Sequence, residues 1–104
     1  MIITTTETVA GREIARTLGV VTGATVRARH IGSDMLAALK NVVGGELGGY
    51  SKLLAGARDE ALRRLAEAAA EKGADAVVGV RLATSTIAPS AAEVLAYGTA
   101  VKLR

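Results

Sequence analysis

The chain has 104 residues, 50% hydrophobic and only 2% aromatic, with no Cys, Phe or Trp and a formal net charge of +3. That length holds one modest core, so we expect a single domain over residues 1–104. The lack of Cys excludes disulfides, thiolate nucleophiles and Cys-ligated zinc. Lys and Arg are mixed among Asp and Glu, which serves solubility. With no signal-like leader and no apolar run of about 18 residues, we expect a cytoplasmic protein without a membrane span.

The first half of the chain predicts two strands and two short helices. Residues 2–6 are β-branched and suit a strand. Residues 12–18 carry apolar side chains at spacings of three and four and precede a glycine, which predicts a short helix. Residues 20–31 alternate between two faces and predict a long strand, bent at Gly23. A second short helix is expected over residues 33–43, before two glycines end it.

Residues 50–72 carry the strongest local pattern, a long amphipathic helix. Its apolar stripe at helical spacing consists of Leu53, Leu54, Ala57, Ala61, Leu65, Ala68 and Ala69. Asp59 with Arg63, and Glu60 with Arg64, stand at the i,i+4 spacing that supports an exposed helix face by about 0.2 to 0.5 kcal/mol per pair. A glycine directly after residue 72 predicts where the helix ends.

Residues 76–86 and 94–103 are rich in β-forming side chains and are separated by the only proline, Pro89. We expect an antiparallel hairpin there, and an α+β domain of order strand, helix, strand, helix, helix, strand, strand. Small aliphatic side chains occupy both faces of these strands, and a chain of this length cannot cover two sheet faces by itself. We therefore expect the chain to be its own partner in a homo-oligomer.

Five segments, in this order, resemble the YbjQ-like family of small bacterial proteins, which carries a heavy-metal-binding label. The segments are Thr4-Thr5-Thr6-Glu7, Val42-Val43-Gly44-Gly45 with Tyr50, Ala57-Arg58 with Ala61-Leu62, Gly73-Ala74-Asp75-Ala76-Val77-Val78-Gly79-Val80 and Gly98-Thr99-Ala100-Val101. The resemblance implies an α+β subunit with a dodecin-like arrangement that assembles into a closed ring, a pentamer. It implies little about activity. The chain departs from the family at residues 30–33, where relatives often have an aromatic side chain.

The heavy-metal label directs attention to His30, the only histidine. Soft metals prefer thiolate, thioether and imidazole ligands, and this chain offers only His30 and two methionines. His30 with Asp34 is the one compact ligand pair for a metal ion, and a ring could bring one copy of the pair from each subunit to its axis. Glu7 and Glu46 are weaker candidates. The alternative is structural, with His30 at a strand end and Asp34 at a helix amino terminus.

The glycine-rich residues 44–49 have the spacing of a phosphate-binding loop, but Tyr50 stands where that loop needs a lysine. Glu46 would also repel a phosphate. Backbone amides at the start of the long helix remain able to hold an anion, with Tyr50 and Glu46 beside them. The alternative, which we favour, is that these glycines let the chain turn tightly between two helices.

No catalytic constellation is visible, so we expect a binding or scaffold module for a small ligand or ion rather than an enzyme. A serine-nucleophile elbow is missing, although Glu7 and Asp34 could act as a carboxylate pair across a subunit interface. Arg27 and Arg29 share one strand face and suggest nucleic-acid binding as an alternative. The lack of aromatic stacking platforms disfavours that alternative.

Overall fold

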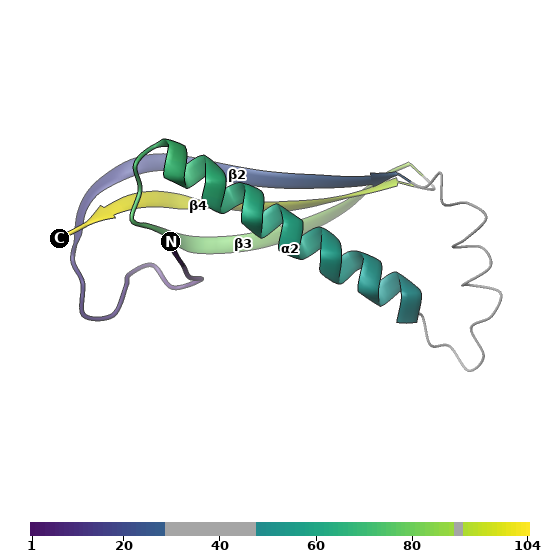
Figure 1. Cartoon of the computed structure of the whole chain (residues 1–104), viewed down its shortest axis with the longest axis horizontal. Helices are drawn as coiled ribbons and strands as arrows, with labels where there is room; N and C mark the ends of the chain where they lie inside the picture. The colour runs from purple at the N-terminus through teal and green to yellow at the C-terminus, as the bar shows by residue number, and fades with distance from the viewer. Residues whose placement is uncertain (29–47, 89–90) are drawn as a thin grey trace.

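The computed structural model describes residues 1–28, 48–88 and 91–104. In this part of the chain, one long helix runs diagonally across a four-stranded mixed sheet, so the expected α+β class is confirmed (Figure 1). The elements are β1 (Ile2–Ile3), β2 (Ile14–Ala28), α2 (Gly48–Glu71), β3 (Ala76–Ala88) and β4 (Ala91–Leu103). No helix among the described residues is long and apolar enough to cross a membrane.

The sheet has the strand order β1-β3-β4-β2. β3 and β4 form the expected antiparallel hairpin, and β2 pairs antiparallel with the other edge of β4. β2 and β3 therefore run in the same direction on either side of β4. β1 is the only parallel neighbour, with Ile2 opposite Ala76 and Ile3 opposite Val77.

The short helix expected over residues 12–18 is wrong, because β2 already begins at Ile14. Ile14 pairs with Leu103, and a register shift between Thr17 and Gly19 follows. Gly19 has φ +111°, a conformation that L side chains rarely adopt, and it allows the strand to bend there. Pairing with β4 and burial of Ile14 thus override a local spacing that favours a helix.

The remaining expectations for the first half have mixed outcomes. The strand over residues 20–31 is confirmed as far as Ala28, and residues 29–31 lie outside the described part. The helix expected over residues 33–43 lies outside it entirely. β1 is shorter than the strand expected over residues 2–6, because Thr4 and Thr6 form a hydrogen-bonded turn.

The long helix is confirmed as α2, and its predicted stripe faces the sheet. Ala57, Ala61, Leu65 and Ala69, each four residues after the last, are all 0% exposed. The helix ends at Glu71, and Gly73, two residues later, has a φ of +76°. The Gly73 amide donates to the Ala70 carbonyl (2.9 Å) and the Ala74 amide to the Ala69 carbonyl (3.1 Å), the Schellman arrangement that such a glycine permits.

On the charged face of α2, one of the two ion pairs expected from the sequence is present and the other is replaced by different contacts. Arg64 Nε contacts Glu60 Oε1 at 3.1 Å, as the i,i+4 spacing predicts. Arg63, expected to pair with Asp59, instead contacts Glu60 and Glu67. Hydrogen bonds from Arg63, with a further contribution from Arg64, lower the pKa of Glu60 to about 2. Arg63, Arg64 and Glu67 are exposed and Glu60 is half-buried, so the cluster is a solvated surface network.

The helix and the sheet approach each other very closely at Gly23. A Cβ at this position would lie 2.2 Å from the Ala61 carbonyl oxygen and 2.4 Å from the Leu65 amide nitrogen. Val21 and Thr25, two residues to either side, are each 3% exposed beneath the helix. The alternation predicted for this strand is thus confirmed, and its smallest residue marks the closest contact with α2.

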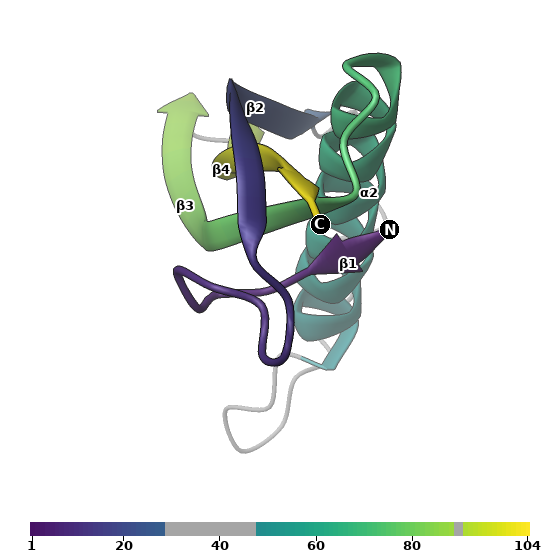
Figure 2. The same ribbon diagram turned by 90° about the vertical axis from the view of Figure 1, so that its left-hand side faces the viewer.

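A second, smaller core lies on the sheet face opposite α2. It contains Ala76, Val78, Val101 and Leu103, with Val9 and Ile14 packed against them. Figure 2 shows that the connection between β1 and β2 loops away from the side on which α2 forms its own layer. This connection therefore covers only one end of the second face.

Candidate functional site

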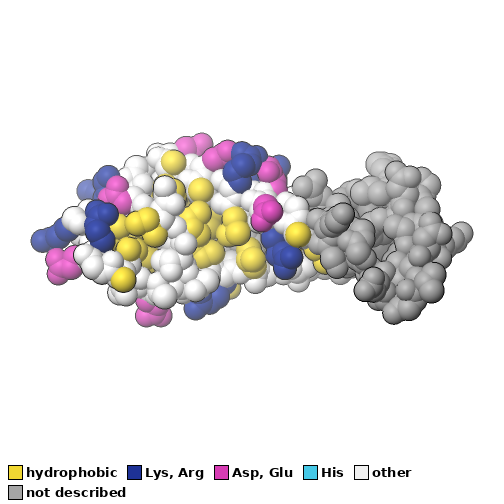
Figure 3. Space-filling model, turned by 60° about the horizontal axis from the view of Figure 1, so that its bottom comes forward, with side chains coloured by type: hydrophobic (Ala, Val, Ile, Leu, Met, Phe, Trp, Pro, Cys, Tyr) yellow, Lys and Arg dark blue, Asp and Glu magenta, His cyan; other side chains and the backbone are white. Residues whose placement is uncertain are grey.

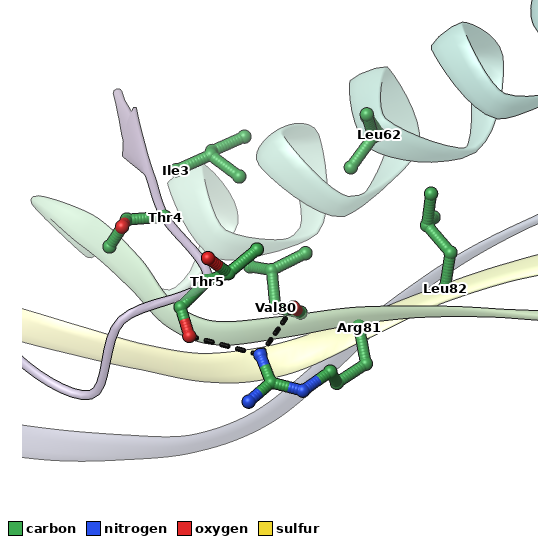
Figure 4. A pocket seen from close by; sticks show the side chains of 7 residues that line it. All are labelled: Ile3, Thr4, Thr5, Leu62, Val80, Arg81 and Leu82. Carbon is green, nitrogen blue, oxygen red and sulfur yellow. Dashed lines mark hydrogen bonds between the residues drawn. The ribbon is translucent and has the colours of Figure 1, made fainter.

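A groove of about 400 Å³ lies where α2 passes the outer edge of β3. Its lining residues are Ile3, Thr4, Thr5, Leu62, Val80, Arg81 and Leu82 (Figure 4). Seen from outside, hydrophobic side chains gather along the middle of this side of the molecule, with charged side chains around them (Figure 3). Figure 1 also shows that the amino-terminal end of α2 diverges from the strands on the side of β3.

The amino-terminal segment determines where the groove begins. Thr4 donates its amide to the Val77 carbonyl (3.0 Å), Gly79 donates to Thr6 (2.8 Å), and Val80 donates to Thr4 (3.0 Å). The segment therefore follows β3 as far as Val80 and then turns away. From residue 81 onward, the outer edge of β3 has no strand partner among the described residues.

The groove is apolar in chemistry. Ile3 is 36% and Leu82 44% exposed, large values for side chains of this kind. Figure 4 shows Ile3, Leu62 and Leu82 on one side of the β3 ribbon and the Arg81 guanidinium on the other. Because Arg81 is the only charged residue of the lining, the groove fits an apolar group and offers no acid–base chemistry.

Arg81 ties the amino-terminal segment to β3. Its Nη1 donates to the carbonyl oxygens of Thr5 and Val80, both at 2.9 Å. The turn before it is held by threonine hydroxyls, with Thr4 Oγ1 2.8 Å from Thr6 Oγ1 and Thr6 Oγ1 donating to the Thr8 carbonyl (2.6 Å). These hydroxyls serve the turn, which fixes one wall of the groove.

The uncovered part of the sheet face opposite α2 is the second candidate surface, which we call the open face. Its most exposed apolar side chains are Val20 (71%), Val26 (52%) and Tyr97 (40%). Val20 pairs with Thr99 and Thr22 with Tyr97, so Val20 and Tyr97 are diagonal neighbours on this face, whereas Val26 lies farther along β2, opposite Glu93. Monomeric proteins usually keep large side chains of adjacent strands covered, and such patches mark contact sites.

The structure describes only some of the residues named from the sequence. Glu7 lies exposed in the connection between β1 and β2. His30, Asp34 and Glu46 lie outside the described residues, and of Tyr50 only the backbone is described, in the first turn of α2. The proposed metal pair and the glycine-rich loop thus stay predictions.

The described residues do not supply a ligand set for a soft metal. Across residues 1–28, 48–88 and 91–104, no three side chains of the types His, Cys, Asp and Glu lie together. The whole chain also lacks the thiolates that soft metals prefer. Within the described part, the donor set therefore does not fit a heavy-metal centre.

Sequence reasoning missed the groove because its lining comes from three separate stretches of chain. The available signals were Leu62, which is half-buried and falls outside the helical stripe, and the exposed Leu82 within the strand pattern. The open face, by contrast, follows from the alternation of residues 20–26, which predicts apolar side chains on both faces of β2.

Comparison with known proteins gives consistent results. A family model named YbjQ, described as "Putative heavy-metal-binding", matches residues 1–104. A UPF0145 protein of Shewanella frigidimarina is 55% identical over 103 residues, covering 99% of this chain and 96% of its own. A UPF0145 protein of Archaeoglobus fulgidus is 61% identical over 104 residues, covering 100% and 96%.

A crystal structure of a protein of unknown function from Pediococcus pentosaceus, assigned to the DUF74 family, is similar in fold. Its TM-score is 0.71 at 22% identity, with 100% of this chain and 98% of that chain covered. The archaeal relative shows that the expected restriction to bacteria is too narrow. Matched over its full length by the family model and by relatives at more than half identity, the chain belongs to the YbjQ family of UPF0145 proteins.

Proposed function

We propose that this chain is the subunit of a homo-oligomeric ring that binds a small ligand or ion at a pocket between subunits. The family resemblance implies five copies. The observation that carries the proposal is the open face, where Val20 and Val26 are 71% and 52% exposed on a sheet whose other face is packed under α2. An antiparallel sheet can keep one solvated face, but that face is then usually polar.

The energy available from this face is suited to assembly through several contacts. Full burial of one exposed Val or Tyr side chain contributes about 1.5 to 3 kcal/mol. Association costs about 4 to 15 kcal/mol, so a single small patch is not enough. A closed ring gives every subunit two interfaces. Burial of Val20, Val26 and Tyr97 supplies only part of the association free energy that each interface needs.

The groove beside Leu82 is the pocket we assign to the ligand. A volume of about 400 Å³ falls within the range of roughly 300 to 1,000 Å³ that small-molecule sites occupy. Its lining favours a small molecule with an apolar body, oriented by the Thr5 hydroxyl. One side of the groove is open, and a second subunit would close it.

The alternative functions find less support. Lys102 pairs with Asp75 at 3.3 Å and Arg104 with Glu13 at 3.9 Å, so these two basic side chains of the carboxyl-terminal end have intramolecular partners. Glu7, a candidate for carboxylate catalysis, stands exposed in a loop. Neither observation favours nucleic-acid binding or an enzyme.

The proposal is tested by measuring the mass of the assembly in solution. We expect light scattering and native mass spectrometry to find a single oligomer at micromolar concentration, and Val20→Lys to reduce it to smaller species. Ala70→Lys, which places the same charge on the exposed side of α2, is the control and should leave the oligomer intact. A wild-type protein that is monomeric at this concentration would refute the proposal.

A further inference from the structure

The sheet has two unpaired edges on opposite sides. Among the described residues, β2 pairs only with β4, so its outer edge is free along Ile14–Ala28. β3 has the amino-terminal segment on its outer edge up to Val80, and from residue 81 to the end of the element no strand of the described part of the chain pairs with it. Exposed edges of this length are templates for pairing with another chain.

Two hydrogen bonds show which residues of β2 and β3 direct their backbone N–H and C=O groups outward, away from the sheet. The Val80 amide donates outward to Thr4, so by alternation Leu82 and Thr84 also point their amides outward, with side chains on the α2 face. In β2 the Ala24 carbonyl accepts from Arg64 Nη1 (2.6 Å) on the outer side. Thr22 and Val26 therefore also point their backbone groups outward, with side chains on the open face.

The faces on which these outward-directed residues carry their side chains favour parallel pairing of the two edges. In an antiparallel pair the residues that exchange hydrogen bonds have side chains on the same face, whereas in a parallel pair the bonded residues of the two strands lie on opposite faces. Outward residues of β3 lie on the α2 face and those of β2 on the open face. β1 already pairs with this edge of β3 in parallel.

We propose that the outer edge of β3 from residue 81 onward binds the outer edge of β2 of a second copy as a parallel strand, and that this copy covers the groove at Leu82. The proposal rests on the homo-oligomer proposed above and names its interface. β2 and β3 run in the same direction within one copy. Each added copy is therefore related to the previous one by the same rotation, and its α2 lies on the same side of the extended sheet. Such head-to-tail contacts form a ring when the repeated rotation closes on itself, as the proposed assembly requires.

Charge supports the same pairing. Leu62 borders the groove, and Arg58, one turn before it on the same flank of α2, is exposed, so this side carries Arg58 and Arg81. The flank above β2 is marked by Arg64 and its Ala24 contact, and it carries Glu60, Glu67 and Glu71, of which the first two are paired with Arg63. The basic side of one copy would therefore face the more acidic flank of the next. Arg64 does not block the edge, since a carbonyl oxygen accepts two hydrogen bonds.

Engineered cysteines test the interface, because the chain has no native Cys to give background cross-links. Ser85 in β3 and Thr22 in β2 are exposed, and both side chains lie on the open face. Three double variants combine Ser85→Cys with a second cysteine in the same chain, at residue 20, 22 or 24. On oxidation, we expect one of these variants to form a ladder of disulfide-linked subunits, which identifies the register. Each single-cysteine variant should stay unlinked.

Two outcomes would overturn the pairing. One is efficient dimerisation of the Thr22→Cys variant alone, which would indicate that β2 pairs with β2 about a two-fold axis. The other is the absence of a linked species in all three registers while light scattering still finds the oligomer. The second outcome would leave the proposed homo-oligomer standing, whereas a monomeric wild-type protein would remove both proposals.

A proline at residue 84 provides an independent measurement. The Thr84 amide points outward, so Thr84→Pro removes no hydrogen bond to another described residue of the subunit, and edge positions of this kind tolerate proline. We expect Thr84→Pro to raise the dissociation constant of the assembly at least roughly tenfold while the circular dichroism of the subunit is retained, with Thr84→Ala as the matched control. An unchanged dissociation constant in a folded Thr84→Pro variant would contradict the proposal.

Discussion

The contact between Gly23 and α2 gives the sharpest test of how the core is built. In the Gly23→Ala variant the new Cβ would stand 2.2 Å from the Ala61 carbonyl oxygen and 2.4 Å from the Leu65 amide nitrogen. Both atoms belong to the helix backbone, so no side chain can rotate away. α2 would have to move by roughly 1 Å to restore ordinary contact, which loosens the packing of the whole stripe.

We expect Gly23→Ala to lower the free energy of unfolding by about 3 kcal/mol, at the upper end of the range for overpacked cores. For a domain of this size, that loss corresponds to a decrease of roughly 2 M in the urea midpoint. Circular dichroism at fixed protein concentration measures it, since a protein that associates gains stability with concentration.

Gly56→Ala is the matched control for the same chemical change. Gly56 is exposed within α2, and a Cβ there would meet nothing within 4 Å. Alanine in a helix interior is more favourable than glycine by about 0.5 to 1 kcal/mol, so this variant should be more stable than the wild type. If Gly23→Ala shifted stability by less than about 0.5 kcal/mol, the close approach of helix and sheet would be refuted.

Three further predictions concern the subunit. Leu65→Ala, at a residue 0% exposed, should lower the free energy of unfolding by about 3 kcal/mol in urea titration, and a change below 1 kcal/mol would contradict its central place. Gly73→Ala should cost about 1 kcal/mol by the same measurement, because φ is +76° there; equal stability would argue against this helix end. The backbone amide of Leu103 and, secondarily, Lys102 lower the pKa of Asp75 from 3.8. Its ionised form therefore stabilises the fold above about pH 4, and this contribution disappears as the pH falls through the lowered pKa. In urea titrations from pH 6 downward, the unfolding midpoint of the Asp75→Asn variant should therefore decrease less with falling pH than that of the wild type. An equal decrease in both proteins would contradict the assignment.

The sequence predicted best those elements whose signal is carried within the element itself. The stripe of residues 57, 61, 65 and 69 repeats every four residues, and a glycine follows the helix, so both its buried face and its end could be read directly. The β3–β4 hairpin was predicted for a similar reason, since two β-rich runs flank a short connection with a proline.

The segment after residue 12 shows where local patterns fail. Ile14 and Leu18 are spaced as on a helix, yet residues 14–28 form one strand. What decides this is the partner strand: β4 offers a full edge from Leu103 to Ala91, and Gly19 lets β2 follow its twist. Neither the partner nor the bend is visible from the spacing of residues within the segment.

The candidate site was predictable only in part, for the same reason. The open face follows from alternation within β2, whereas the groove requires Ile3, Leu62 and Leu82 to meet from distant parts of the chain. Sequence patterns suggested functional roles for residues 30–50 instead, because glycine runs and a lone histidine attract attention. The described residues place the exposed apolar surface elsewhere.

The use of small side chains connects the core of the subunit with its proposed assembly. Ala57, Ala61 and Ala69 lie fully buried over a strand that has Gly23 at the point of contact, so α2 lies close to the sheet. Close packing of small residues makes a thin domain in which one helix covers one face, and the connection from β1 to β2 covers only the end of the other. Larger residues would not fit beneath α2, and no other described element lies over Val20, Val26 and Tyr97. Among the described residues, the exposure of Val20, Val26 and Tyr97 is therefore a consequence of how the core is packed, and the association with a second copy that we propose would remove these side chains from water.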